Sequence, residues 1–104
     1  MKLPIFMIAV LISNFAFSAA TNSAKMKVTS IESRESGQHD IRFDGVVPDQ
    51  ECSLSDRAIL DESLTGGKSM FSILLAAFMS EKDLVIRVDG CLSAPKIIKV
   101  QVYQ

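Results

Sequence analysis

The stretch that decides the fold is residues 67–103, which read GKSMFSILLAAFMSEKDLVIRVDGCLSAPKIIKVQVY. Its first part, Ser69–Ser80, consists mostly of good helix formers and predicts an apolar helix. The charged residues 81–83 then make a turn. Two runs that alternate like strands follow, one ending at Cys91 and one covering Lys96–Tyr103. The stretch therefore predicts a helix followed by a β-hairpin.

The alternation assigns a face to each residue of this hairpin. In its first strand we expect one face to carry Leu84, Ile86 and Val88, and the opposite face to carry Val85, Arg87 and Asp89. In its second strand we expect Ile98, Val100 and Val102 to point inward, and Ile97, Lys99, Gln101 and Tyr103 to point outward. Pro95 stands just before this strand, where a sheet tolerates proline.

Upstream of the helix, the pattern predicts three more strands. Alternation from Met26 to Glu32 indicates the first, and residues 39–47 the second, with a polar loop at Ser33–Gln38 between them. Ala58–Leu60 is a short third strand, and the polar loop Asp61–Gly67 leads to the helix. The order β-β-β-α-β-β predicts a mainly β (α+β) chain folded as an OB-type five-stranded barrel. An open α+β sandwich is the alternative.

Residues 1–20 have the character of a cleaved export signal. Lys2 gives a basic start, Ile5–Ile12 is nearly all apolar, and Ser18-Ala19-Ala20 is a small-residue cleavage site. The apolar run is shorter than the roughly 20 residues needed to span a membrane. We therefore expect a periplasmic or secreted protein whose single mature domain is residues 21–104, with a retained N-terminal anchor as the alternative.

Cys52 and Cys91 both lie in the mature part. In a small exported chain, two cysteines indicate one disulfide, which would stabilise this domain by roughly 4 kcal/mol on the loop-entropy model. The competing interpretation is a reactive or metal-binding thiol pair. That pair would need further ligands, and the chain has a single histidine, His39.

Charge and motifs argue against several classes of function. The formal net charge is −1 and the basic residues are scattered, so we expect no nucleic-acid partner. The ligand set is too poor for a metal site, and no cofactor is expected. There is no G-x-S-x-G motif, so a Ser-His-Asp hydrolase built on His39 and Asp40 is the weakest class considered. The sequence thus favours a non-enzymatic protein.

The helix is too apolar for a helix that packs on one side only. A surface helix normally shows one apolar stripe and one polar face. Here large apolar residues spread most of the way round: Met70, Phe71, Ile73, Leu74, Leu75, Phe78 and Met79. Two buried faces predict a partner subunit, with a helix clamped between the barrel and a long loop as the alternative. The expected interface residues are Ser72, Ala76, Met79, Val85, Ile97 and Tyr103.

Three segments resemble a known group of proteins: residues 74–78 (LLAAF), residues 85–91 (VIRVDGC) and residues 95–100 (PKIIKV). They resemble the corresponding segments of a group of small exported bacterial proteins. Proteins of this group are similar to the B subunits of subtilase cytotoxin and pertussis-like toxins. The resemblance covers roughly residues 52–103, and the Cys52–Cys91 pairing is also similar to theirs. It implies an OB-type barrel, a ring of five subunits with helices around a pore, binding of cell-surface glycans and a separate A subunit.

From this resemblance we expect an oligomeric binding module for a glycan or a protein. The alternative is a monomeric periplasmic binding or inhibitor protein. Loops carry binding residues more often than strands do. We therefore place the candidate ligand site in the first predicted hairpin loop, at Arg34, Glu35, Ser36, Gln38 and His39.

Overall fold

A curved sheet and one helix make up the computed structural model, which describes residues 19–104. Before the helix come β1 (Thr21–Asn22), β2 (Val28–Ser33), β3 (Gln38–Phe43) and β4 (Ala58–Asp61). Helix α2 (Gly67–Ser80) is followed by β5 (Leu84–Cys91) and β6 (Pro95–Val102). The mainly β chain with one helix is confirmed. The predicted leader lies outside the described residues except for Ala19 and Ala20, and within residues 19–104 no helix has the length and apolarity needed to span a membrane.

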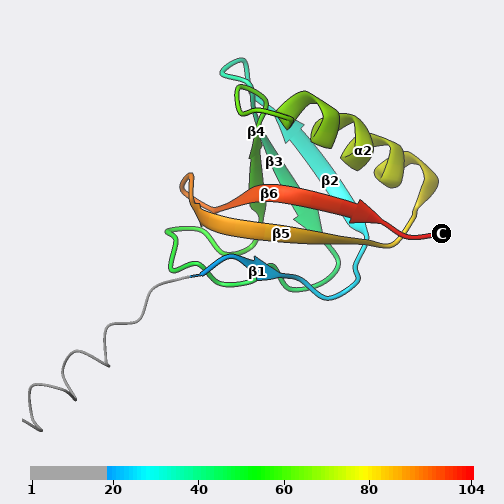
Figure 1. The fold of residues 1–104 in the computed structure, drawn as a ribbon, viewed down its shortest axis with the longest axis horizontal. Helices are drawn as coiled ribbons and strands as arrows, with labels where there is room; N and C mark the ends of the chain where they lie inside the picture. Colours follow the sequence, from blue (N-terminus) through cyan, green and yellow to red (C-terminus); the bar gives the residue numbers. More distant parts are fainter. Residues whose placement is uncertain (1–18) are drawn as a thin grey trace, which may run out of the picture.

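The six strands form one sheet in the order β1-β5-β6-β4-β3-β2 (Figure 1). Neighbours are antiparallel except β4 and β6, which pair in parallel at Ile59 and Lys96. The two outer strands are consecutive in the chain, and Met26 between them exchanges backbone hydrogen bonds of 2.9 and 2.8 Å with Leu84. The sheet is not closed and has a sixth strand, β1, so the five-stranded barrel is not confirmed.

The core lies inside the curl of the sheet, with α2 packed across its side (Figure 1). Residues 84, 86 and 88 of β5 are fully buried, as the alternation predicts. Helix α2 contributes Leu74 and Ala77, while β3 and β4 contribute Ile41, Ala58 and Leu60. The helix therefore presents only one narrow face to the sheet.

Strand β6 departs from the predicted alternation at its start. Ile97 is fully buried and Ile98 is 38% exposed, the reverse of the expectation. The pairing gives the reason: Arg87 faces Lys99 and Val88 faces Ile97, so Ile98 is one extra residue on β6. Such a β-bulge shifts the faces of the strand by one residue. Ile97 belongs to the core and is removed from the predicted interface.

Strand bounds upstream differ from the prediction by a few residues. Ser33 ends β2 and Gln38 begins β3, so the connecting turn is only residues 34–37. Gly37 has φ +90°, a conformation that L side chains rarely adopt. Strand β3 ends at Phe43, and the backbone N–H of the next residue, Asp44, bonds to the carbonyl of Lys27 at 3.0 Å.

Residues 44–57 form a long loop that two contacts fasten to the end of β5. The predicted disulfide Cys52–Cys91 is present, with the two Cα atoms 5.6 Å apart. Beside it, the buried side chain of Gln50 accepts the N–H of Gly90 at 3.0 Å and donates to the carbonyl of Ala19 at 2.9 Å. The loop therefore links β5 to the start of the described chain.

Candidate functional site

The five residues predicted to bind a ligand do not form one surface. Arg34, Glu35 and Ser36 are exposed at the β2–β3 turn, Gln38 is half-buried, and His39 is 4% exposed. The guanidinium of Arg34 already donates to Asp40 at 2.6 Å. The turn thus offers two exposed polar side chains without an ion-pair partner among residues 19–104, which is a weak basis for a site.

His39 is buried within β3 rather than exposed in the predicted ligand-binding loop. It lies on the inward face of β3, where its Nδ1 is 2.7 Å from Ser33 Oγ and its Nε2 is 2.7 Å from Glu62 Oε2. The imidazole also stacks on Phe71 of α2, with ring centroids 3.8 Å apart. Serine, histidine and carboxylate in this order resemble an activated nucleophile. The stack joins His39 to α2, and the two hydrogen bonds join it to β2 and to the β4–α2 connection, so we assign the cluster a structural role.

Asp40 is also buried, on the opposite face of β3. Its Oδ2 accepts hydrogen bonds from Arg34 at 2.6 Å and from Arg57 at 3.2 Å. Arg57 also bonds to Asp56, and this contact lowers the pKa of Asp56 and raises that of Arg57. Asp40 Oδ1 is buried without a hydrogen-bond partner among residues 19–104. The charges on this face of the sheet therefore neutralise one another.

A pocket of about 250 Å³ lies at the other end of the sheet, on the outer side of β1, β5 and β6. It is lined by Asn22, Ser23, Val85, Arg87, Lys99, Gln101 and Tyr103. The antiparallel register places Val85 opposite Gln101 and Arg87 opposite Lys99. Because cross-strand partners project to the same side of a sheet, two adjacent pairs bring these four side chains together.

The charges in this pocket are not balanced by the protein. Arg87 faces Lys99 directly, and like charges in opposite positions of a sheet repel. The guanidinium of Arg87 donates to the amide oxygen of Asn22 at 3.2 Å. Among residues 19–104, neither Arg87 nor Lys99 has a carboxylate within salt-bridge distance. The pocket is therefore suited to an anion.

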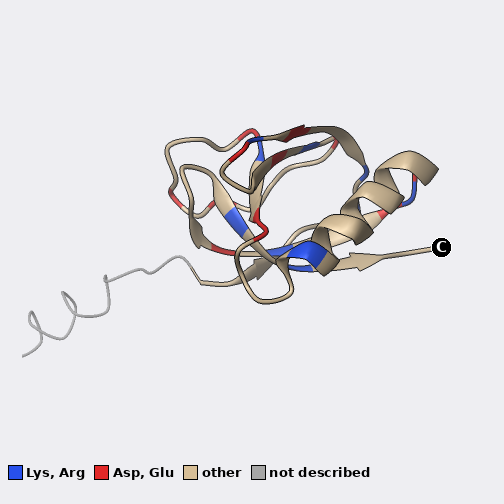
Figure 2. Ribbon diagram, turned by 90° about the horizontal axis from the view of Figure 1, so that it is seen from above, with Lys and Arg blue, Asp and Glu red and all other residues tan. Residues whose placement is uncertain are grey.

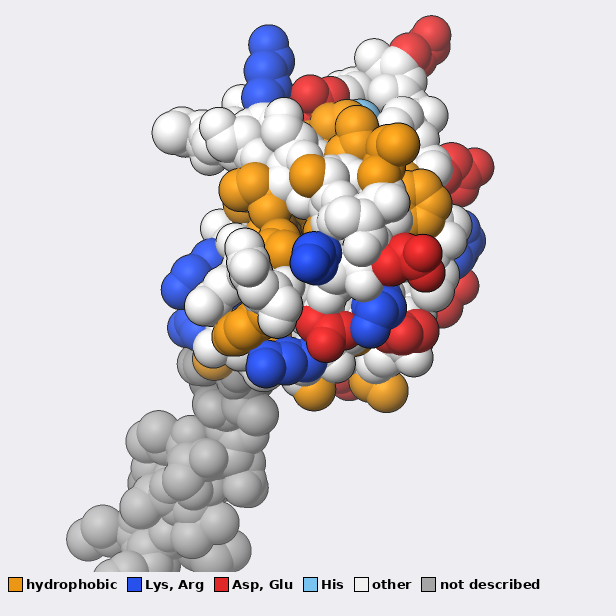
Figure 3. Space-filling model, turned by 90° about the vertical axis from the view of Figure 1, so that its right-hand side faces the viewer, with side chains coloured by type: hydrophobic (Ala, Val, Ile, Leu, Met, Phe, Trp, Pro, Cys, Tyr) orange, Lys and Arg blue, Asp and Glu red, His pale blue; other side chains and the backbone are white. Residues whose placement is uncertain are grey.

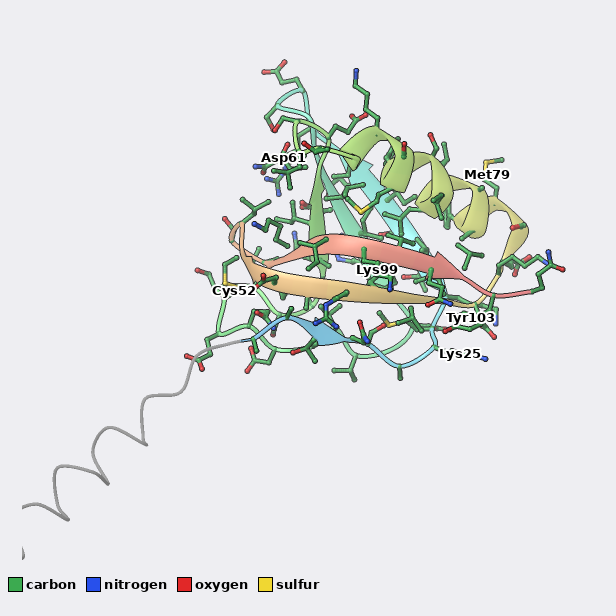
Figure 4. All side chains as sticks on the ribbon, viewed as in Figure 1. Lys25, Cys52, Asp61, Met79, Lys99 and Tyr103 are labelled. Atoms are coloured by element: carbon green, nitrogen blue, oxygen red, sulfur yellow. A yellow bond between two sulfur atoms is a disulfide. The ribbon has the colours of Figure 1, made fainter. Side chains whose placement is uncertain are left out.

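Tyr103 lines the pocket and has a cation on its ring. Its backbone N–H donates to the carbonyl of Asp83 at 2.8 Å, which fixes the residue just beyond β6. The ammonium of Lys25 lies 4.3 Å from the ring centroid (Figure 4). Asp83 itself bonds Lys27 at 2.6 Å, which holds the pKa of Asp83 below its usual value and raises that of Lys27. The positive charge of Lys25 lowers the pKa of Asp83 by a smaller amount.

Sequence reasoning missed most of this pocket. Val85 and Tyr103 were expected at a subunit interface but line the pocket, and Asn22, Ser23, Arg87, Lys99 and Gln101 were not singled out. A signal was present, since the polar residues at alternate positions of a predicted hairpin share one outer face. The contribution of β1 had no signal, because its two residues are too few to show alternation.

The outer face of α2 is apolar and uncovered by the described part of the chain. Its exposed large side chains are Ile73 (40%), Leu75 (39%), Phe78 (37%) and Met79 (76%). Ser72 and Ala76, two predicted interface residues, are exposed among them. Lys68 is the one charged residue of the helix (Figure 2), and hydrophobic side chains gather on the side of the molecule where α2 ends (Figure 3). Within residues 19–104, no long loop clamps the helix against the sheet.

Neither a metal-binding cluster among the described residues nor a similarity to a known protein family accompanies the pocket. No group of three or more His, Cys, Asp and Glu side chains within residues 19–104 could hold a metal ion. Comparison of the chain with models of known protein families finds no match, and comparison with curated protein sequences finds none either.

Proposed function

We propose that this protein is an exported, non-enzymatic binding module that holds an acidic glycan in the pocket of β1, β5 and β6. One observation carries the proposal. Arg87 and Lys99 stand side by side without a carboxylate partner among the described residues, next to the ring of Tyr103. A protein that places two like charges together loses stability, and an anionic ligand recovers it.

The lining of the pocket supports a sugar rather than a bare ion. A carboxylate or sulfate on the sugar accepts from the guanidinium of Arg87, which presents a planar pair of donors, and from Lys99. Sugar hydroxyls find donors and acceptors on Asn22, Ser23 and Gln101. The volume of about 250 Å³ is slightly below that of pockets for drug-sized ligands. It suits one terminal acidic sugar better than a long chain.

The same proposal includes an OB-type barrel for the fold and a homo-oligomer for the assembly. The backbone bridge between Met26 and Leu84 brings the two outer strands of the sheet towards each other, and this supports a partly open OB-type barrel. The uncovered apolar face of α2 supports a homo-oligomer, for which the toxin-like resemblance favours a ring of five. The same resemblance makes a separate A subunit a candidate partner.

Arg87→Gln tests the site, and Arg42→Gln on β3 is its matched control. We compare sialyllactose with lactose, two sugars that differ by one acidic residue, using isothermal titration calorimetry. Loss of one charge-assisted hydrogen bond, worth about 1.5–3 kcal/mol, weakens binding of the acidic sugar by roughly 10- to 100-fold. Arg42→Gln leaves the affinity unchanged. Equal binding by the wild type and Arg87→Gln would remove the pocket as the site.

A monomeric periplasmic inhibitor is the second candidate, and one observation favours it. The disulfide fastens the loop of residues 44–57, on which Val46 is 85% exposed, as a loop that enters a partner's cleft would be. Light scattering coupled to size exclusion separates the candidates. A mass of several chains supports the toxin-like module, and a clean monomer supports the inhibitor.

A further inference from the structure

We propose that Lys25 sets the ligand preference of the pocket, because its ammonium covers the ring of Tyr103 until an acidic group draws it away. This inference rests on the proposed glycan function and adds a selecting residue outside the pocket lining. Lys25 belongs to the short link between β1 and the Met26 bridge, two residues after Ser23, whose backbone N–H donates to the carbonyl of Ile86 at 2.8 Å.

The position of Lys25 leaves the aromatic ring as its main partner. Its Nζ atom lies 4.3 Å from the ring centroid of Tyr103. The carboxylate whose pKa its charge perturbs is Asp83, and Lys27 already binds that carboxylate at 2.6 Å. Lys25 forms no salt bridge among residues 19–104. Its ammonium is therefore held loosely and next to the pocket.

The preference for an acidic sugar follows from the strengths of two contacts that compete for the Lys25 ammonium. A cation–π contact at an exposed site is worth a factor of about 2 to 5 in an equilibrium constant. A hydrogen bond between charged groups is worth a factor of roughly 10 or more. A sugar carboxylate therefore recruits the ammonium and frees the ring for stacking. A neutral sugar provides no such partner and must displace Lys25 at a net cost.

Lys25→Met separates these contributions, because methionine keeps much of the aliphatic stem and removes the charge. Without the ammonium, we expect lactose to bind up to about 5-fold more tightly, since no cation–π contact has to be broken before a sugar reaches the ring. We expect sialyllactose to bind roughly 5-fold more weakly, since one cation is lost. The preference for the acidic sugar thus falls by about fivefold or more. Lys68→Met, at the first turn of α2, is the matched control and keeps the wild-type preference.

The single tyrosine makes the measurement direct. The chain has one Tyr and no Trp, so its intrinsic tyrosine fluorescence reports on Tyr103 alone. Titrating each variant with sialyllactose and with lactose gives both affinities without a label. Calorimetry on the same samples checks that a fluorescence change corresponds to binding.

Each outcome has a distinct meaning. A reduced acid preference in Lys25→Met, with Lys68→Met unchanged, supports the inference. An unchanged preference in Lys25→Met overturns it and leaves the proposed function standing. If the wild type binds neither sugar in calorimetry or fluorescence, both the inference and the proposed function are wrong.

Discussion

His39 is held on three sides by groups from different elements: Ser33 of β2, Glu62 after β4 and Phe71 of α2. An aromatic stack and two hydrogen bonds meet in a ring that is almost completely buried. Because these partners come from separate segments, the imidazole connects the helix to the sheet in a way that aliphatic packing alone does not.

Replacing this ring tests that connection. His39→Ala removes both hydrogen bonds and leaves a cavity beside Phe71, so we expect a loss of about 2–4 kcal/mol in the free energy of unfolding. Urea unfolding followed by circular dichroism measures the change. Glu35→Ala on the adjacent exposed turn is the control and should shift stability by less than about 0.5 kcal/mol. A wild-type midpoint for His39→Ala would mean that the cluster contributes nothing to the fold.

For single residues, the sequence predicted on which face of a strand a side chain lies. It did not predict which side chains from other segments contact it. The alternation of β5 placed Arg87 outward, and the structure agrees. It could not show that Asn22, far away in the chain, would accept a hydrogen bond from that guanidinium through its amide oxygen. The burial of His39 and Asp40 was missed for the same reason, since the sequence does not show which side chains from other segments will cover them.

The two faces of helix α2 differ clearly in burial. Ala76 and Ala77 are adjacent and chemically identical, yet Ala77 is 2% exposed in the core while Ala76 faces outward. The pair separates the role of the helix in folding from any role in assembly, because the same substitution can be made at both positions.

Ala77→Glu should unfold the domain, because a buried carboxylate without a partner is costly. Ala76→Glu should leave the fold intact. If α2 is the subunit interface, Ala76→Glu also converts an oligomer into a folded monomer, which light scattering and circular dichroism detect together. An intact oligomer of Ala76→Glu would exclude this face as the interface, and a folded Ala77→Glu would contradict the assigned core.

The helix and the strands were predicted well where the hydrophobic pattern extended over many residues. They were predicted poorly where the pattern fitted two alternations. The helix was expected from Ser69 and begins at Gly67, after Gly66 with φ +79°. Strand β6 was found, but its two adjacent isoleucines fit either alternation, and only the pairing with β5 reveals the bulge at Ile98.

One covalent cross-link, the Cys52–Cys91 disulfide, contributes to the stability of the whole molecule. A chain this small has a limited core, because a large share of its surface stays in water. The Cys52–Cys91 bond joins residues 39 apart and lowers the entropy of the unfolded chain by an amount worth about 4 kcal/mol at 25 °C.

Removing the bond should therefore lower stability by about 3–4 kcal/mol. We expect the Cys52→Ala, Cys91→Ala double variant to unfold at a much lower urea concentration than the oxidised wild type. A reductant should shift the wild type in the same direction and leave the double variant unchanged. Coincident unfolding curves for oxidised wild type and double variant would show that the bond does not contribute to stability.

The same bond also decides how the molecule responds to a pulling force. Strand β4, helix α2 and all of β5 lie inside the covalent ring that the bond closes, whereas β1, β2 and β3 lie before it. Tension applied at the two ends passes through the sulfur atoms and leaves the enclosed segment without load. A stretched oxidised chain is shorter than a reduced one by about 130 Å, the span of 39 extended residues. Only the arms outside the ring can be drawn out, so the helix stays shielded from mechanical unravelling.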